Sequence, residues 1–258
     1  MKLFTSLFAT FLVFTSCFMQ AQSYTHPANV AKIGLSVGGD IEMPHGLGYE
    51  YLLNTASDVN FNTNGLPFTE GELTNMECDN PTLRLGFSFN PARLKKTEIQ
   101  LSFLSIEDRI DKVHYETADK SQYLDVSATN KETAFEAVML MKDEVGPLRF
   151  YAGGGANVGL SHDGKVLVKG YLENSSTAET DPNDIAFEGQ YIDETYTQRN
   201  GINQRLFVQA GMGIRLLKRM EIGFECRKGF GYRATFDGPF TFTTLKRSLG
   251  FSLKYALF

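Results

Sequence analysis

The sequence has no tryptophan, only three cysteines among 258 residues, and more acidic than basic residues. Removal of an N-terminal export signal would leave Cys78 and Cys226, which are too few for a disulfide framework. No group of cysteines and histidines has the spacing of a zinc site. The net charge of −5 at pH 7 argues against nucleic-acid binding, which requires a basic surface. We therefore expect no metal, cofactor or nucleic acid to define the function.

Long apolar runs are also absent after the N-terminus, so no transmembrane helix is predicted there. Residues 1–21 read as a secretory signal peptide, in which Lys2 precedes an apolar stretch and cleavage is expected after Ala21. The alternative is a lipoprotein signal with lipidation of Cys17, although the bulky Phe18 that follows is unusual there. We assign 22–30 to a short periplasmic segment and 31–258 to one β-barrel domain.

The chain is rich in glycine and aromatic residues, with 24 Gly, 21 Phe and 11 Tyr, and it shows no helical periodicity. Polar and apolar residues instead alternate with the period of two that is typical of strands. Each alternating segment is long enough for a tilted strand to cross a bilayer, which takes about 9 to 11 residues. The eight segments span residues 32–40, 82–90, 97–105, 133–142, 148–160, 204–217, 220–232 and 243–258.

The connections between these segments alternate in length. Short turns are expected at 91–96, 143–147 and 218–219, and long outer loops at 41–81, 106–132, 161–203 and 233–242. This rhythm is typical of bacterial outer-membrane barrels. The fold class predicted is therefore all-β: a transmembrane antiparallel up-and-down β-barrel of eight strands. Residues 46–53 (GLGYEYLL) could add a strand, so a ten-stranded barrel is the alternative.

The two faces of the predicted strands differ in chemistry. One parity is apolar, as in Ile33, Leu35 and Val37, and suits contact with lipid. The other parity carries charges of both signs, which can pair inside a barrel. The predicted interior ionic network comprises Lys32, Arg84, Glu98, Glu136, Arg149, Arg215, Glu221, Glu225, Arg227, Lys246 and Lys254. Arg247 falls on the lipid parity near the outer end of its strand, where its long side chain can reach the headgroups.

Three consecutive glycines, Gly153 to Gly155, raise the question of a phosphate-binding loop. The run lacks the GxGxxG pattern, and GFGYRA at 229–234 matches GxGxxA but leads into no helix. Gly153, Gly155 and Gly159 share the inward parity with Arg149 and Tyr151, so we expect these glycines to leave room for their large neighbours inside a narrow barrel.

The strand YAGGGANVGL, the hairpin QAGMGIRLLKRMEIGFECRKGFG and the ending LKYALF resemble the outer-membrane protein β-barrel domain family, the small OmpA/OmpX-like barrels. The resemblance covers roughly 31–258. It implies insertion by the barrel-assembly machinery, with Tyr255 and Phe258 as the C-terminal assembly signal, although Phe258 is one residue out of phase with the apolar parity. It also implies location in the outer membrane of a Gram-negative bacterium.

Function is predicted less sharply than fold. We expect no catalysis, because Ser161, His162 and Asp163 are adjacent on a strand end and should point in different directions; a lipid A-modifying enzyme is the remote alternative. Segments 42–80 and 162–203 hold fifteen Asp or Glu against three Lys or Arg. Glu179, Asp181 and Asp184 are candidates for binding a divalent cation that bridges to lipopolysaccharide.

Two roles remain. A barrel closed by interior charges would serve a structural or surface-interaction role as a monomer, with outer-membrane lipid, lipopolysaccharide and an extracellular ligand as partners. A narrow porin-like channel for small ions or solutes is the alternative. Eight strands favour the closed barrel and ten would favour the channel.

Overall fold

The computed structural model describes residues 29–44, 49–59, 78–91, 96–116, 122–173, 189–217 and 219–257. The predicted signal peptide, Cys17, the carboxylates Glu179, Asp181 and Asp184, and Phe258 all lie outside the described residues, as do the side chains of Cys78 and Lys246. Within the described part, no helix has the length and apolarity that a membrane crossing requires.

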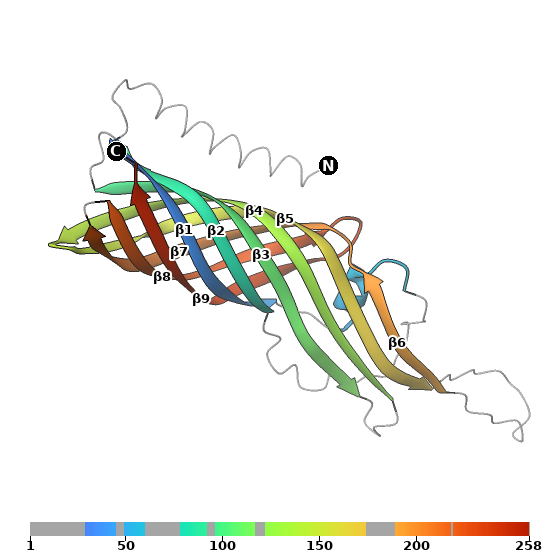
Figure 1. The fold of residues 1–258 in the computed structure, drawn as a ribbon. Coiled ribbons are helices and arrows are strands. Elements are labelled where there is room, and N and C mark those ends of the chain that lie inside the picture. Colours follow the sequence, from blue (N-terminus) through green and yellow to red (C-terminus); the bar gives the residue numbers. More distant parts are fainter. Residues whose placement is uncertain are drawn as a thin grey trace, which may run out of the picture.

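Eight antiparallel strands close into a ring (Figure 1). They are β1 (Asn29–Pro44), β2 (Cys78–Asn90), β3 (Thr97–Glu116), β4 (Tyr123–Val145), β5 (Leu148–Glu173), β7 (Gly201–Leu217), β8 (Met220–Thr235) and β9 (Phe240–Ala256). Each strand pairs with the next in this order, and β9 pairs with β1 to close the barrel. The eight-stranded barrel predicted from the sequence is confirmed.

The ten-stranded alternative is wrong. Of the segment at 46–53, the described residues 49–53 form no strand and belong instead to a short helix, α2 (Tyr49–Thr55). A further strand, β6 (Gly189–Thr197), does form, but it pairs only with the outer part of β5 and stays outside the ring. The inner part of β5 pairs with β7 instead.

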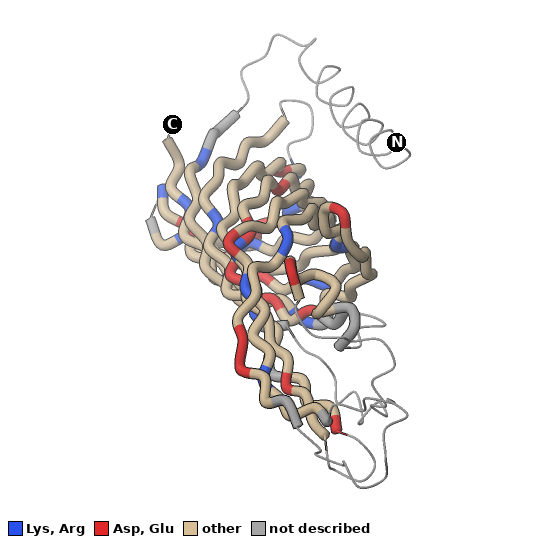
Figure 2. The backbone as a smooth tube through the Cα atoms, turned by 90° about the vertical axis from the view of Figure 1, so that its right-hand side faces the viewer, with Lys and Arg blue, Asp and Glu red and all other residues tan. Residues whose placement is uncertain are grey.

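The predicted outer loops are shorter than expected, because the strands continue into them. β3 and β4 remain paired up to Glu116 and Tyr123, and β5 extends to Glu173. The fourth loop is reduced to the four residues 236–239 between β8 and β9. The outer parts of β3, β4, β5 and β6 therefore form a sheet that projects beyond the ring (Figures 1 and 2). We call it the projecting sheet.

The projecting sheet has its own apolar core. Leu52 and Leu53 of α2, which are 0% and 3% exposed, pack with buried side chains of the sheet. Those side chains are Ile110, Tyr115, Leu124, Val126, Ala128, Val166, Val168, Leu172, Ile192 and Tyr196. Helix α2 thus folds the first connection back onto β4 and β5.

Alternation reverses at three bulges, where one strand has an extra residue. The pairing shifts between Ile110 and Val113 in β3 and between His162 and Lys165 in β5. In β9 the extra residue is Lys246, opposite β8. Regular alternation from Arg247, which was placed on the lipid parity, would turn Leu245 outward as well, but Leu245 is buried because the bulge resets the alternation.

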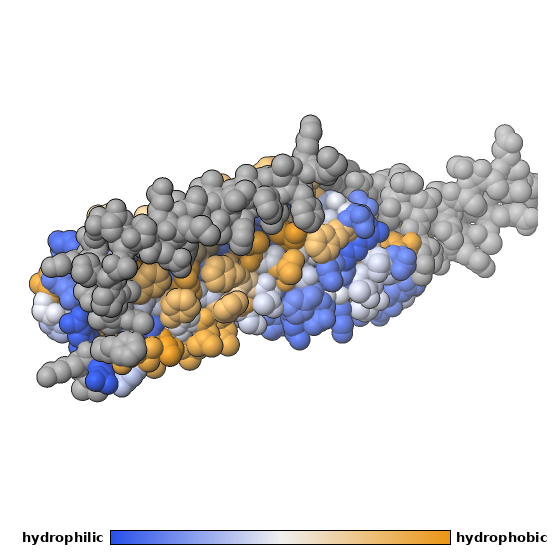
Figure 3. Space-filling model, turned by 90° about the horizontal axis from the view of Figure 1, so that it is seen from above, coloured by the Kyte–Doolittle hydropathy of each residue, from blue (hydrophilic) through white to orange (hydrophobic). Residues whose placement is uncertain are grey.

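The outer surface of the ring carries an apolar belt (Figure 3). Ile33, Leu35 and Val37, predicted to face lipid, are 48%, 46% and 50% exposed. Aromatic residues pair across neighbouring strands on this face, with ring centroids 5.6 Å apart for Phe103 and Phe135 and 5.3 Å for Phe224 and Phe251. A soluble barrel would bury such side chains inside, so the surface is that of a membrane-spanning barrel.

Candidate functional site: the ionic interior of the barrel

Three clusters of charged side chains follow one another along the barrel interior. Their order can be read along β8, which contributes Glu221 to the first, Glu225 and Arg227 to the second and Arg233 to the third. We call them the turn-end, middle and loop-end clusters, from the short turns toward the projecting sheet.

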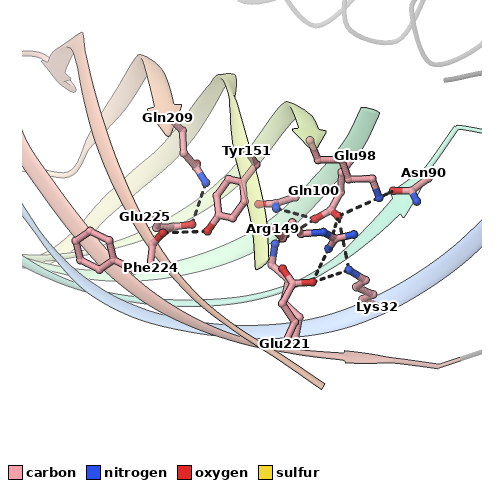
Figure 4. Close-up of polar contacts among 12 residues, drawn as sticks. Lys32, Asn90, Glu98, Gln100, Arg149, Tyr151, Gln209, Glu221, Phe224 and Glu225 are labelled. Carbon is pink, nitrogen blue, oxygen red and sulfur yellow. Dashed lines mark hydrogen bonds and ion pairs between the residues drawn. The ribbon is translucent and has the colours of Figure 1, made fainter. Parts of the chain in front are cut away.

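The turn-end cluster is centred on Glu98 and Glu221 (Figure 4). Lys254 Nζ donates to Glu98 over 3.1 Å, and Lys32 Nζ donates to Glu221 over 2.9 Å. Arg149 reaches both carboxylates and also Glu144 at the turn. With Glu144, these side chains come from six different strands, so the cluster ties the strands together across the lumen.

Lys142 is an additional member of this cluster that the sequence analysis did not select. Its ammonium donates to Asn90 Oδ1 over 2.7 Å and lies 3.8 Å from Glu98. It is the last residue of the predicted strand 133–142, whereas β4 continues to Val145, and Lys142 is buried on the same inward parity as Glu136. The turn-end cluster therefore has four cations against two buried carboxylates.

The middle cluster surrounds Arg84 and Arg227. Arg227 donates to Glu136 over 2.6 Å and to Glu225 over 3.0 Å, and Arg84 donates to Glu225 over 3.3 Å. Asp40 lies 3.6 Å from Arg84 and accepts a hydrogen bond from Ser248. With two cations and three carboxylates, this cluster offsets part of the positive excess at the turn end.

Aromatic rings fill the space beside these charges. The Arg227 guanidinium lies 4.6 Å from the centroid of Phe207, and Lys254 Nζ lies 5.3 Å from that of Tyr151. Tyr151 donates its hydroxyl proton to the Phe224 carbonyl oxygen over 3.2 Å. Such cation–π contacts add to the ion pairs where water is scarce.

The loop-end cluster was missed by the sequence analysis. Arg205 donates twice to Glu132, over 2.6 and 2.9 Å, and also pairs with Glu42. Arg233 donates to Glu42 over 2.7 Å and pairs with Asp108. All five side chains are buried.

A signal for the loop-end cluster was present in the sequence. Glu42, Asp108, Glu132 and Arg233 had been placed in outer loops, whereas the strands run through these positions. Arg205 has the inward parity of its strand and was omitted. Extending the alternation of each strand outward would have found all five residues. This cluster also has two cations against three carboxylates, so the interior set as a whole is electrically neutral.

Two members of the predicted network stand apart. Arg215 is exposed and pairs with Glu144 over 3.1 Å at the turn, so its placement in the interior was wrong. The side chain of Lys246 lies outside the described part, and its backbone is the extra residue of the β9 bulge. The structure brings Lys32, Arg84, Glu98, Glu136, Arg149, Glu221, Glu225, Arg227 and Lys254 together inside the barrel.

The inward glycines serve neighbours other than those expected. A Cβ atom on Gly159 would lie 2.0 Å from Glu132 Oε1, and one on Gly155 would lie 2.8 Å from the Phe207 ring. The space for Tyr151 comes from Gly211, on the strand beside it, where a Cβ atom would lie 2.5 Å from the tyrosine ring. The inward glycines thus make room for large side chains as expected, but at Gly155 and Gly159 these are Phe207 and Glu132 of the neighbouring strands rather than Arg149 or Tyr151.

A small cavity lined by both polar and apolar side chains lies beside the middle cluster. Its volume is about 40 Å³, and Ser36, Arg84, Gln100, Glu136 and Ser252 are among its lining residues. The Ser36 hydroxyl and Arg84 Nε are buried nearby without a hydrogen-bond partner in the described structure. A space of this size with polar groups in its wall holds about one or two water molecules, which can satisfy such groups.

The histidine that was considered for catalysis, His162, is half-buried. Ser161 donates to the Gly201 carbonyl oxygen over 3.3 Å and does not contact His162. His162 Nδ1 lies 3.2 Å from Asp163, contrary to the expectation that these neighbours point apart, because Asp163 sits in the β5 bulge with φ 53°. Within the described residues, no three His, Cys, Asp or Glu side chains are arranged to hold a metal ion.

No family model matches the chain, and the search of curated proteins gives no match. Several solved structures are similar to the chain. Three of them are Ail, the attachment invasion locus protein of Yersinia pestis (11% identity, 87% of this chain and 99% of that chain, TM-score 0.34), Neisserial surface protein A (11%, 88% and 95%, TM-score 0.31) and the N-terminal β-barrel domain of Pseudomonas aeruginosa OprF (11%, 88% and 98%, TM-score 0.26). The chain is similar to small outer-membrane β-barrels.

Proposed function

We propose that this protein is an integral outer-membrane barrel of a Gram-negative bacterium, with a closed interior and a projecting sheet that meets partners outside the cell. The membrane location is supported by the apolar belt on the outside of the closed ring. Closure matters because every backbone N–H and C=O group in hydrocarbon needs a partner, and a closed ring supplies one to each strand. The export signal predicted at 1–21 agrees with this location.

The closed interior rests on one observation: the three ionic clusters. They follow one another along the lumen, and their side chains come from opposite walls. A permeating ion would have to separate buried pairs in each cluster, at several kcal/mol for each uncompensated charge. An eight-stranded barrel has an interior only wide enough for its own side chains. This favours a structural role over conduction.

The surface-interaction role is supported by the projecting sheet. Strands β3 to β6 extend beyond the ring and are held in shape by the apolar cluster with α2. Flexible loops would not need such a core, so the sheet presents a defined surface to an extracellular ligand. Divalent-cation binding through Glu179, Asp181 and Asp184 remains a prediction for a segment outside the described residues.

The experiment that tests closure is planar-bilayer conductance of the signal-free protein, refolded in detergent. Folding is verified first by the shift in gel mobility that heating produces in intact barrels. We expect no stable conductance steps from the folded protein. Reproducible steps would instead support the second candidate, a narrow channel, for which the 40 Å³ cavity beside the middle cluster would be the starting point.

A further inference from the structure

Two basic side chains lie on the outer face of the barrel, within the apolar belt. Lys228 of β8 is exposed between the outward-facing Cys226 and Phe230. Arg247 of β9 is exposed on the same face as Leu249 and Phe251. Neither residue belongs to the interior clusters.

The β9 bulge brings these two residues together. Arg227 pairs with Ser248 and Gly229 pairs with Leu245, so Lys228 lies opposite the two residues Lys246 and Arg247. Without the extra residue, strict alternation would place only one residue opposite Lys228. The bulge allows Leu245 and Ser248 both to be buried while Arg247 stays outside, next to Lys228 on the neighbouring strand.

The surroundings of this pair are apolar. Val208 of β7 pairs with Lys228, and Ile41 of β1 pairs with Arg247. Val208 and Phe230 are 66% and 63% exposed. In the described part of the chain, neither Lys228 nor Arg247 has a carboxylate partner. A charge facing hydrocarbon is costly, so two adjacent cations without a protein partner call for an anion from the membrane.

The position along the strand indicates which leaflet supplies it. On the outward parity of β8, counted from the short turn, Met220, Ile222, Phe224 and Cys226 precede Lys228, and Phe230, Tyr232 and Ala234 follow it, so Lys228 lies past the middle of the strand. Arg247 lies toward the same, loop end of β9. Their long side chains can therefore extend to the headgroups of the outer leaflet rather than the inner one.

We propose that Lys228 and Arg247 bind a phosphate group of a lipid in the outer leaflet of the membrane. The Arg247 guanidinium can donate two parallel hydrogen bonds to phosphate, and the Lys228 ammonium adds a point charge. Phe230 and Leu249 flank the pair and would contact the acyl chains of the same lipid. The site rests on the outer-membrane location given above and is independent of whether the barrel conducts.

The test measures lipid retention by native mass spectrometry of the folded barrel in detergent, with bisphosphorylated lipid A or enzymatically dephosphorylated lipid A added at equal concentration. We expect the protein to retain the phosphorylated lipid at least tenfold better. The double variant Lys228→Gln, Arg247→Gln should lose this preference. The exchange Lys228→Arg, Arg247→Lys should keep it, because the two charges remain.

The matched control is Arg109→Gln, Lys169→Gln. It removes two exposed cations that pair with Glu107 and Asp193 on the projecting sheet, and it should retain lipid as the unmodified protein does. If the Gln pair at 228 and 247 does not fold, Lys228→Leu, Arg247→Leu replaces it, since leucine suits the belt. Equal retention of both lipids, retention by the folded belt variant, or displacement by inorganic phosphate alone would each overturn the proposal. Conductance with intact lipid preference would overturn only the closed barrel.

Discussion

At the scale of single residues, the interior depends on glycines that lie opposite large side chains. Gly159 is the sharpest case, because a Cβ atom there would meet three atoms of the Glu132 side chain at 2.0 to 2.7 Å. Glu132 is buried and is held by Arg205 and Asn203. Any side chain at position 159 must therefore displace a carboxylate from its ion pair.

We predict that Gly159→Ala lowers the free energy of unfolding by about 1 to 3 kcal/mol, the usual cost of overpacking. The measurement is urea unfolding in lipid vesicles, followed by far-UV circular dichroism because the chain has no tryptophan. Gly39→Ala is the control, since a Cβ atom at Gly39 has nothing within 4 Å. Equal stability of the two variants would show that Glu132 can move without loss.

Burial decides how much the ion pair of an arginine contributes to the free energy of unfolding. Arg205→Met would leave Glu132 without its guanidinium partner in the loop-end cluster, and we expect a loss of about 3 to 5 kcal/mol. Arg215→Met breaks an exposed pair with Glu144, and we expect a loss of no more than about 1 kcal/mol. The same unfolding assay compares them. A loss at Arg215 as large as that at Arg205 would contradict the argument from burial.

At the scale of elements, the projecting sheet and α2 form a unit with its own core. Leu52 is fully buried there, so Leu52→Ala should lower the local stability of the sheet by about 2 to 5 kcal/mol. Hydrogen exchange should then speed up at 123–128 and 166–172, with protection of the ring strands unchanged. Asn54→Ala, at an exposed position of the same helix, is the control. If the ring strands lost hydrogen-exchange protection to the same extent, the projecting sheet and the ring would unfold as one cooperative unit.

The sequence predicted which strands exist and which faces they bury, but not where the strands end. In the strands at 32–40 and 148–160, polar and apolar residues alternate regularly and only one face is apolar. The period of two was therefore enough to predict these strands and their faces. Beyond Ile110 and His162 the alternation reverses at bulges, and the regular pattern is interrupted. The inward face also changes from charged to apolar, because Leu124 and Val126 pack against α2. The charged residues in these outer strand segments were therefore assigned to loops.

At the scale of the whole molecule, the clusters arise only from closure of the ring. Arg205 and Glu42 are 163 positions apart in the sequence and meet because β1 pairs with β9 while β7 pairs with β8. Their parity could be read from the sequence, but which acid meets which base depends on the register of every strand pair. For this reason the turn-end and middle residues, apart from Lys142 and Asp40, were identified as a set, and their partners were not.

Conductance tests whether the three clusters close the barrel independently. Arg149→Ala opens only the turn-end cluster, and the paired truncation Glu136→Ala, Arg227→Ala opens only the middle one without leaving an unpaired charge between them. We expect each of these variants to remain non-conducting in planar bilayers, because the loop-end cluster still spans the lumen. A variant that carries Arg149→Ala, Glu136→Ala and Arg227→Ala together with Glu132→Ala and Arg205→Ala should produce conductance steps, because no cluster is then intact. Steps from Arg149→Ala alone would mean that the turn-end cluster is the barrier and that the other two are already permeable to ions.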